Sequence, residues 1–201
     1  SQRSGWAHLY LYDLNSGELK RTLTEGPWLV RNILQVDAKR REALIQTAGR
    51  DPSISPYYRD ICRLNLDTGE LTPLVSGDYE YNVYGPEDRQ VAARAGFGID
   101  SADVNGLSPH GDYLVATYSR VDTPPVSLLI DRQGREILTL ETADISGLPQ
   151  GWQWPEPVKV KAADGKTDIY GVVYRPPNFS KDQSYPIIDF SCGHPYFTWV
   201  P

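Results

Sequence analysis

The residues of this sequence that could support nucleophilic catalysis include a serine and a histidine two positions apart. Ser108 and His110 lie in the segment Leu-Ser-Pro-His-Gly-Asp at 107–112. A histidine can activate a neighbouring serine by removing its proton. The catalytic serine of a hydrolase, however, stands in a GxSxG turn between a strand and a helix, and these 201 residues contain no GxSxG. Because proline and glycine flank His110, we predict a turn in which both residues have a structural role.

The two cysteines, Cys62 and Cys192, give no sign of a metal centre. They lie far apart in the sequence, without a CxxC motif and without a histidine pair at metal-ligand spacing. Neither a zinc site nor a disulfide framework is indicated. We therefore expect no metal and no cofactor, and we expect both cysteines to behave as small buried apolar residues.

The charge distribution argues against a nucleic-acid partner. The net charge is -6 and the isoelectric point is about 5.1, with basic residues scattered along the chain. The basic cluster at 39–41, Lys-Arg-Arg, follows an expected strand and is interpreted as a solvated turn. No apolar run approaches the roughly 18 residues of a membrane span.

Short apolar runs broken by Gly, Asn, Asp and Pro predict many antiparallel strands and almost no helix. One strand–turn–strand segment occurs three times, at 9–23, 61–75 and 128–140, and its turn glycines are 52 and 65 residues apart. Repetition at this interval is typical of four-stranded propeller blades, and a β-sandwich with similar hairpins is the alternative. The segment 85–106 is interpreted as an insertion. The turns are expected to use positive-φ glycines and side chains that bond back to the backbone: Gly17, Gly69 and Gly134, with Asn15, Asp67 and Asp131.

The character of the chain changes near Trp152. The segment 151–157, Gly-Trp-Gln-Trp-Pro-Glu-Pro, is stiff and aromatic, which favours a connector between two units. We expect Trp152 and Trp154 to pack at this junction, with an aromatic ligand platform as the alternative. Beyond it we expect a hairpin over 158–177 and an apolar strand at 185–190, buried on both faces.

At this junction the sequence resembles the dipeptidyl-peptidase IV branch of the prolyl oligopeptidase family of serine peptidases. The resemblance rests on residues 4–13, on Leu-Ser-Pro-His-Gly-Asp-Tyr at 107–113, on Tyr-Ser-Arg-Val-Asp-Thr-Pro-Pro at 118–125, and on the segments 161–165, 169–171 and 175–177. It implies a mainly β chain: the last blades of a propeller at 1–151, made of four-stranded antiparallel sheets. The junction and first strands of an α/β-hydrolase domain would follow at 152–201.

The family resemblance also implies where a catalytic site would lie. The family's Ser, Asp and His triad belongs to the hydrolase domain, and no residue of this chain matches it, so the chain alone should be inactive. The family places an oxyanion-stabilising tyrosine in a Tyr-Gly/Ala-Gly-Pro segment, where this sequence has Cys192 and, two positions on, His194. His194 is one candidate donor in its place, Tyr196 is another, and a purely structural loop is the third interpretation.

The acidic residues that hold a substrate amino terminus in this family belong to an earlier propeller insertion. Glu80, Glu87 and Asp88 are therefore interpreted as residues of a solvated loop. The motif Asn-Phe-Ser at 178–180 matches the glycosylation pattern, which matters only in a eukaryotic secretory protein.

The leading hypothesis is a fragment of a serine peptidase whose full-length parent hydrolyses proline-containing peptides, with the propeller gating access. The alternative is a noncatalytic β-propeller binding scaffold. Expected partners are a peptide substrate, the remaining propeller blades and the hydrolase domain, and a homodimer of the parent is compatible with the family. The sequence itself assigns no localisation; the resemblance suggests a periplasmic or extracellular parent.

Overall fold

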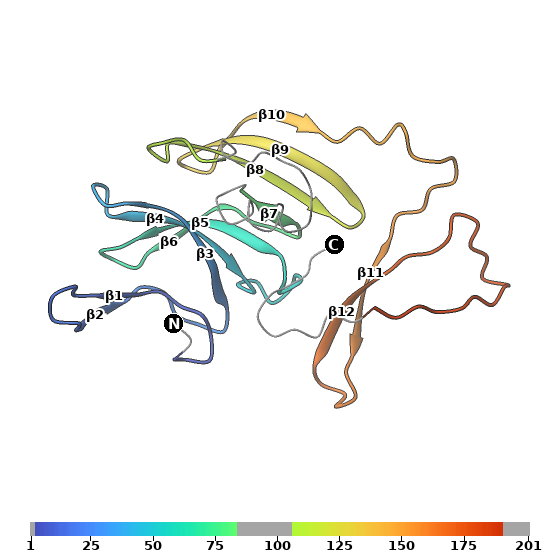
Figure 1. Cartoon of the computed structure of the whole chain (residues 1–201), viewed down its shortest axis with the longest axis horizontal. Helices are drawn as coiled ribbons and strands as arrows, with labels where there is room; N and C mark the ends of the chain where they lie inside the picture. Colours follow the sequence, from blue (N-terminus) through green and yellow to red (C-terminus); the bar gives the residue numbers. More distant parts are fainter. Residues whose placement is uncertain (1–2, 84–105, 191–201) are drawn as a thin grey trace.

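The computed structural model describes residues 3–83 and 106–190, and these parts of the chain consist of β-strands joined by turns (Figure 1). In these two ranges there is no helix with the length and apolar character needed to cross a membrane. The strands have the following bounds: β1 Tyr10–Tyr12, β2 Leu19–Thr22, β3 Leu29–Asp37, β4 Glu42–Ala48, β5 Arg59–Asn65, β6 Leu71–Val75, β7 Glu80–Asn82, β8 Tyr113–Arg120, β9 Thr123–Asp131, β10 Glu136–Thr142, β11 Glu156–Lys161 and β12 Asp168–Val173.

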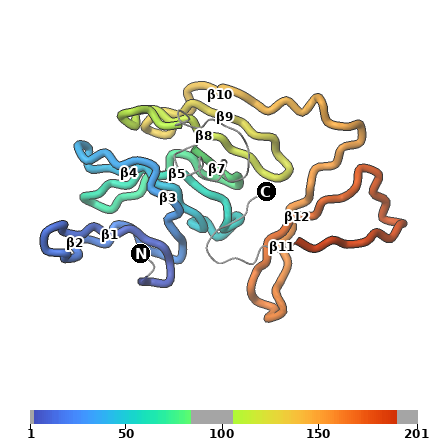
Figure 2. The backbone as a smooth tube through the Cα atoms, in the orientation of Figure 1, coloured from blue at the N-terminus to red at the C-terminus, as the bar shows by residue number. Residues whose placement is uncertain are grey.

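The strands of the described residues form consecutive antiparallel sheets. Strands β3 to β6 make one four-stranded sheet in chain order, and β7 to β10 make a second; these are the second and third blades. The two-stranded sheet β1–β2 is the first blade segment, and β11–β12 is the C-terminal hairpin. The backbone trace shows the blades following one another along the chain (Figure 2). This arrangement confirms the expected partial propeller, because each four-stranded sheet is a self-contained meander of neighbouring strands.

The apolar core lies between blades. One buried cluster joins the second and third blades, and a second cluster joins the first blade segment to the second blade. Ile61 on β5 is fully buried in the first of these, and its strand neighbour Cys62 is fully buried in the second. Consecutive side chains of a strand point to opposite faces, so β5 supplies both interfaces. Cys62 thus has the buried, apolar role expected from the sequence.

The three repeated hairpins form as the sequence predicts, with one correction. Gly17, Gly69 and Gly134 all have positive φ, at 71°, 79° and 84°. The side chains that accept from the turn backbone are Asp13, Asn65 and Asp131, so the assignment of Asn15 and Asp67 was wrong. Each acceptor bonds to amides that follow it, two and three residues on at Asp13 and Asn65 and two and four on at Asp131, so it stands at the start of the turn.

The C-terminal hairpin forms where it was predicted, but the apolar strand expected at 185–190 does not. Residues 184–190 adopt no regular structure. Ile187 and Ile188 are each 93% exposed, and Phe190 is 83% exposed. No strand of the described residues pairs with this segment, and a strand forms only when its backbone groups find partners in a sheet. The prediction of burial on both faces is therefore wrong for this structure.

The turn of each later blade packs against the preceding blade. A methyl group placed on Gly134 would lie 2.7 Å from the carbonyl oxygen of Leu74 at the end of β6. On Gly69 it would lie 3.2 Å from the carbonyl oxygen of Leu23, just after β2. Glycine is therefore needed in these turns for close approach as well as for its positive φ.

We predict that Gly134→Ala lowers the free energy of unfolding by about 1 to 3 kcal/mol more than Gly165→Ala does. Gly165 has a similar φ of 66° and open space around it, so its variant measures backbone strain without the clash. Urea unfolding of the two variants would make the comparison. Equal losses would show that the approach to Leu74 is not tight.

Candidate functional site

The second and third blades have two polar ends, and the C-terminal hairpin lies at one of them. Tyr57, in the loop between β4 and β5, packs edge-on against Tyr170 of β12, with ring centroids 5.7 Å apart. We call this end the hairpin end. The repeated turns and the β3–β4 turn lie at the opposite end, at the left of Figure 1, which we call the turn end.

A buried glutamate at the hairpin end joins the second blade to the third. Glu80 begins β7 and is 9% exposed. One carboxylate oxygen accepts the backbone N–H of Arg59 at 2.9 Å, and the other forms an ion pair with the Arg59 guanidinium. Burial raises the pKa of Glu80, and Arg59 opposes that rise. The expectation that Glu80 lies in a solvated loop is wrong, because it begins an inner strand covered by the neighbouring blade.

Arg31 of β3 adds a second positive charge beside this pair. Burial lowers the pKa of Arg31, and the charge of Arg59 lowers it further, while Glu80 acts in the opposite direction. A carboxylate flanked by two guanidinium groups is held ionised more firmly than burial alone would allow. The Arg59–Glu80 pair joins the start of β5 in the second blade to the start of β7 in the third.

A second acidic group at the hairpin end has fewer partners. The side chain of Asp60 is 7% exposed, its Oδ2 lies 3.8 Å from Nη1 of Arg50, and its Oδ1 has no hydrogen-bond partner. Burial raises the pKa of Asp60, and Arg50 partly offsets this. Arg50 also donates to Sγ of Cys62 at 3.3 Å and lies over the Trp28 ring. Burial raises the pKa of the Cys62 thiol as well, which makes it a poor nucleophile.

The β8–β9 turn completes the hairpin end. Arg120 pairs with Asp122 through Nε at 2.6 Å, also pairs with Asp78, and lies over the Tyr79 ring. The side-chain hydrogen bond from Arg120 lowers the pKa of Asp122. This end therefore presents paired charges and aromatic rings, which suit polar contacts with a neighbouring domain or a peptide.

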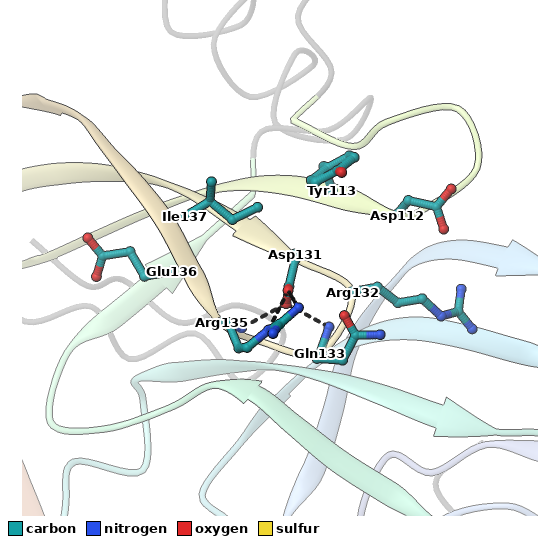
Figure 3. A pocket seen from close by; sticks show the side chains of 8 residues that line it. All are labelled: Asp112, Tyr113, Asp131, Arg132, Gln133, Arg135, Glu136 and Ile137. Atoms are coloured by element: carbon teal, nitrogen blue, oxygen red, sulfur yellow. Dashed lines mark hydrogen bonds and ion pairs between the residues drawn. The ribbon is translucent and has the colours of Figure 1, made fainter.

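One hollow lies at the turn end, remote from the C-terminal hairpin. It measures about 430 Å³ and is open to solvent (Figure 3). Its charged side chains are already engaged: Asp131 accepts from the Gln133 and Arg135 backbone and from the Arg135 guanidinium, and Arg132 pairs with Glu42 of the second blade. These bonds stabilise the β9–β10 turn, so we assign the hollow no catalytic role.

Ser108 and His110 have the structural roles predicted for them. Oγ of Ser108 accepts the N–H of Tyr113 at 3.0 Å, which closes the turn before β8. The carbonyl oxygen of His110 accepts from Arg40 at 2.7 Å, and Arg40 also pairs with Asp112 at 3.0 Å. The basic cluster at 39–41 is thus a surface turn, and Arg40 within it links the second blade to the third.

The oxyanion-region candidates Cys192 and His194 lie outside the described residues, and so does Tyr196. The same holds for Glu87, Asp88 and almost all of the expected insertion at 85–106. Across residues 3–83 and 106–190, no group of three or more His, Cys, Asp or Glu side chains is arranged to hold a metal ion. The structure reveals three acidic groups at the hairpin end that the sequence analysis had not identified as site residues: Asp60, Asp78 and Asp122. Their only sequence signal was a position next to strand ends.

A family model described as the dipeptidyl peptidase IV (DPP IV) N-terminal region matches residues 1–125 of this chain. The chain belongs to this family. The match covers the first blade segment, the second blade, and the third blade up to the start of β9.

Relatives of this DPP IV family member extend the similarity beyond those blades. The dipeptidyl peptidase 4 of Trichophyton tonsurans and that of Trichophyton rubrum are each 27% identical over 200 residues, 97% of this chain. That of Arthroderma otae is 26% identical over the same share. The chain spans only 22% of the length of each of these relatives.

A solved structure agrees with the fold of this DPP IV family member. The crystal structure of a Bacteroides ovatus protein assigned as a dipeptidyl aminopeptidase IV matches 92% of this chain with a TM-score of 0.66 and 26% identity. The chain covers 25% of that protein. The arrangement of the blades and the hairpin is therefore shared with a much longer relative.

We predict that Arg59→Ala lowers the free energy of unfolding by about 3 kcal/mol, because it leaves the buried Glu80 carboxylate without its guanidinium. The matched control is Arg41→Ala, which breaks the exposed pair between Arg41 and Asp67 and should change the stability far less. Both are measured by urea unfolding at neutral pH. Similar losses for the two variants would contradict the role given to Glu80.

Asp60 should make stability depend on pH. Its pKa is raised in the folded state, so the stability that the neutral carboxyl contributes is present below its ordinary pKa and is lost as the pH rises through the raised value. Asp60→Asn stays neutral, and we expect its stability relative to the wild-type chain to increase as the pH rises from about 4 to about 7. Urea unfolding across that range tests this. A difference that does not change with pH would show that Asp60 does not titrate differently on folding.

Proposed function

We propose that this chain forms the last propeller blades and the start of the hydrolase domain of a serine peptidase that hydrolyses proline-containing peptides, with the blades limiting access to its active site. The observation that carries the proposal is the extent of the similarity. Relatives named dipeptidyl peptidase 4 match 97% of the chain, well past the blades and through the C-terminal hairpin. We call the full-length protein encoded by the same reading frame the parent.

The geometry of the hairpin end supports this arrangement. The Tyr57–Tyr170 contact holds the hairpin beside the second blade. In the proposal, the rest of the hydrolase domain continues from this hairpin, and the exposed Ile187, Ile188 and Phe190 pack inside it. The paired charges around Glu80 and Arg120 then line the side of the blades that faces the catalytic domain.

We place the domain boundary at residue 152, with blades over 1–151 and the hydrolase portion over 152–201. The connector between β10 and β11 has no strand, and Trp152 and Trp154 contact each other edge-on with centroids 6.3 Å apart. Both rings are about two-fifths exposed, which leaves room for packing against further residues at the junction. A periplasmic or extracellular parent, and its dimerisation, are further parts of the proposal.

The alternative of a noncatalytic binding scaffold explains less. A scaffold made of the propeller alone accounts for similarity over the blades, whereas the similarity here extends across the expected junction. The feature in its favour is Cys192 at the position of the family's oxyanion tyrosine, since a thiol is a weak hydrogen-bond donor.

The test is chromogenic hydrolysis by the parent of Gly-Pro and Gly-Leu p-nitroanilides, with and without a serine-directed covalent inhibitor. We expect inhibitable cleavage of the proline substrate, faster than the leucine substrate by on the order of 100-fold. The 201-residue chain is the inactive control. A folded parent that cleaves neither substrate would overturn the proposal in favour of the scaffold.

A further inference from the structure

Three consecutive residues that lead into β5 contact three different parts of the chain. Tyr57 packs edge-on against Tyr170 of the C-terminal hairpin. Burial raises the pKa of Tyr58, and charged side chains of the third blade modify that rise, so Tyr58 lies near that blade. Arg59 forms an ion pair with Glu80 at the start of β7. The second blade, the third blade and the hairpin therefore meet around this short segment.

The β4–β5 loop at 49–58, which precedes β5, is ordered by its own hydrogen bonds. Oδ1 of Asp51 accepts the N–H of Ser53 at 2.8 Å and its hydroxyl at 2.6 Å. Further along, the N–H of Tyr58 donates to the carbonyl oxygen of Ser55 at 3.2 Å. Two prolines within the loop restrict its backbone further. The ring that the loop presents to the hairpin is therefore held in place before the hairpin packs on it.

The ring of Tyr170 is supported from its own hairpin. Tyr170 lies directly opposite Lys159 in the β11–β12 ladder, and the ammonium nitrogen of Lys159 lies 5.3 Å from the centre of its ring. Lys159 in turn pairs with Asp168 at 2.8 Å. Both rings of the contact thus have fixed supports, which favours a defined orientation of the hairpin against the second blade.

The two faces of the hairpin differ in their chemistry. The face that carries Tyr170 also carries Lys159 and Asp168, because alternate residues of a strand share a face. The opposite face carries Val160 and Ile169, both about half exposed. The second blade therefore meets the hairpin on its aromatic and charged face, which has the polar character of contacts between domains. The apolar face is left for the interior of the proposed hydrolase domain.

We propose that Tyr57 is a positioning residue that sets the angle between the blades and the hydrolase portion, and so determines how long a peptide reaches the active site. The inference rests on the proposed function, since it assigns to one side chain the restriction of access proposed for the blades. Tyr58 and Arg59 hold the adjoining backbone against the third blade, whereas Tyr170 belongs to the hairpin from which the hydrolase domain continues. Movement of the hairpin away from the blades therefore has to break the aromatic contact.

Limited proteolysis and substrate length test this role in the parent. Tyr57→Ala removes the ring, and Tyr57→Phe keeps it. Tyr113→Ala is the matched control, because Tyr113 is similarly exposed and lies at the turn end, on the hollow without a catalytic role. Chymotrypsin cleavage after Trp152, in the connector, is followed by mass spectrometry. The ratio of kcat/KM is measured between a long peptide that begins with Gly-Pro and Gly-Pro p-nitroanilide.

We expect cleavage after Trp152 to be faster in Tyr57→Ala than in the wild type by about fivefold or more, because the hairpin must move before the connector is cut. The kcat/KM ratio should shift toward the long peptide by about fivefold, with kcat on the p-nitroanilide unchanged. Tyr57→Phe and Tyr113→Ala should match the wild type in both measurements.

Unchanged cleavage after Trp152 in Tyr57→Ala would overturn the positioning role, whether or not the parent cleaves proline substrates. In an active parent, an unchanged kcat/KM ratio would overturn it too. Faster cleavage after Trp152 in a folded but inactive parent would uphold the positioning role and overturn only the peptidase proposal.

Discussion

The packing of one sheet face against the next is the interaction on which the rest of this structure depends. A four-stranded sheet with two apolar faces cannot bury both by itself, so each blade needs a neighbour on either side. The two buried clusters lie between blades rather than inside one, and β5 supplies side chains to both. The charged pairs between blades lie at the ends of the sheets, where the strands emerge from the packed layers.

The carboxylates at the two ends differ in their burial and in where their partners come from. At the turn end, the carboxyl of Asp131 is satisfied by its own turn, while exposed or half-buried arginines form the pairs between blades. At the hairpin end, Glu80 and Asp60 are buried with charges drawn from other strands, and burial raises the pKa of each. Buried charges of this kind destabilise unless their partners are fixed, so they restrict how two blades can sit together.

The sequence was informative where local chemistry decides the structure and less so where distant segments meet. The alternation of apolar residues and the turn glycines predicted the three repeated hairpins, and a change in composition predicted the β11–β12 hairpin. The Asx acceptors were placed two residues too late in two turns, because the pattern alone does not show which amide an oxygen reaches. Glu80 was misjudged because its burial comes from a neighbouring blade, and 185–190 was misjudged because an apolar run becomes a strand only beside a partner.

The residue after each Asx position has a consequence for how the chain assembles. The first two turns have the same length and the third is one residue shorter, and this position is leucine, leucine and arginine at 14, 66 and 132. Leu66 meets an apolar surface and Arg132 meets Glu42, so blades of the same shape present different chemistry to the blade before them. A half-buried arginine that loses its acidic partner is less favourable than one that keeps it, so a mismatched neighbour would be penalised. The second and third blades are therefore not equivalent in what they require of the preceding sheet at this position.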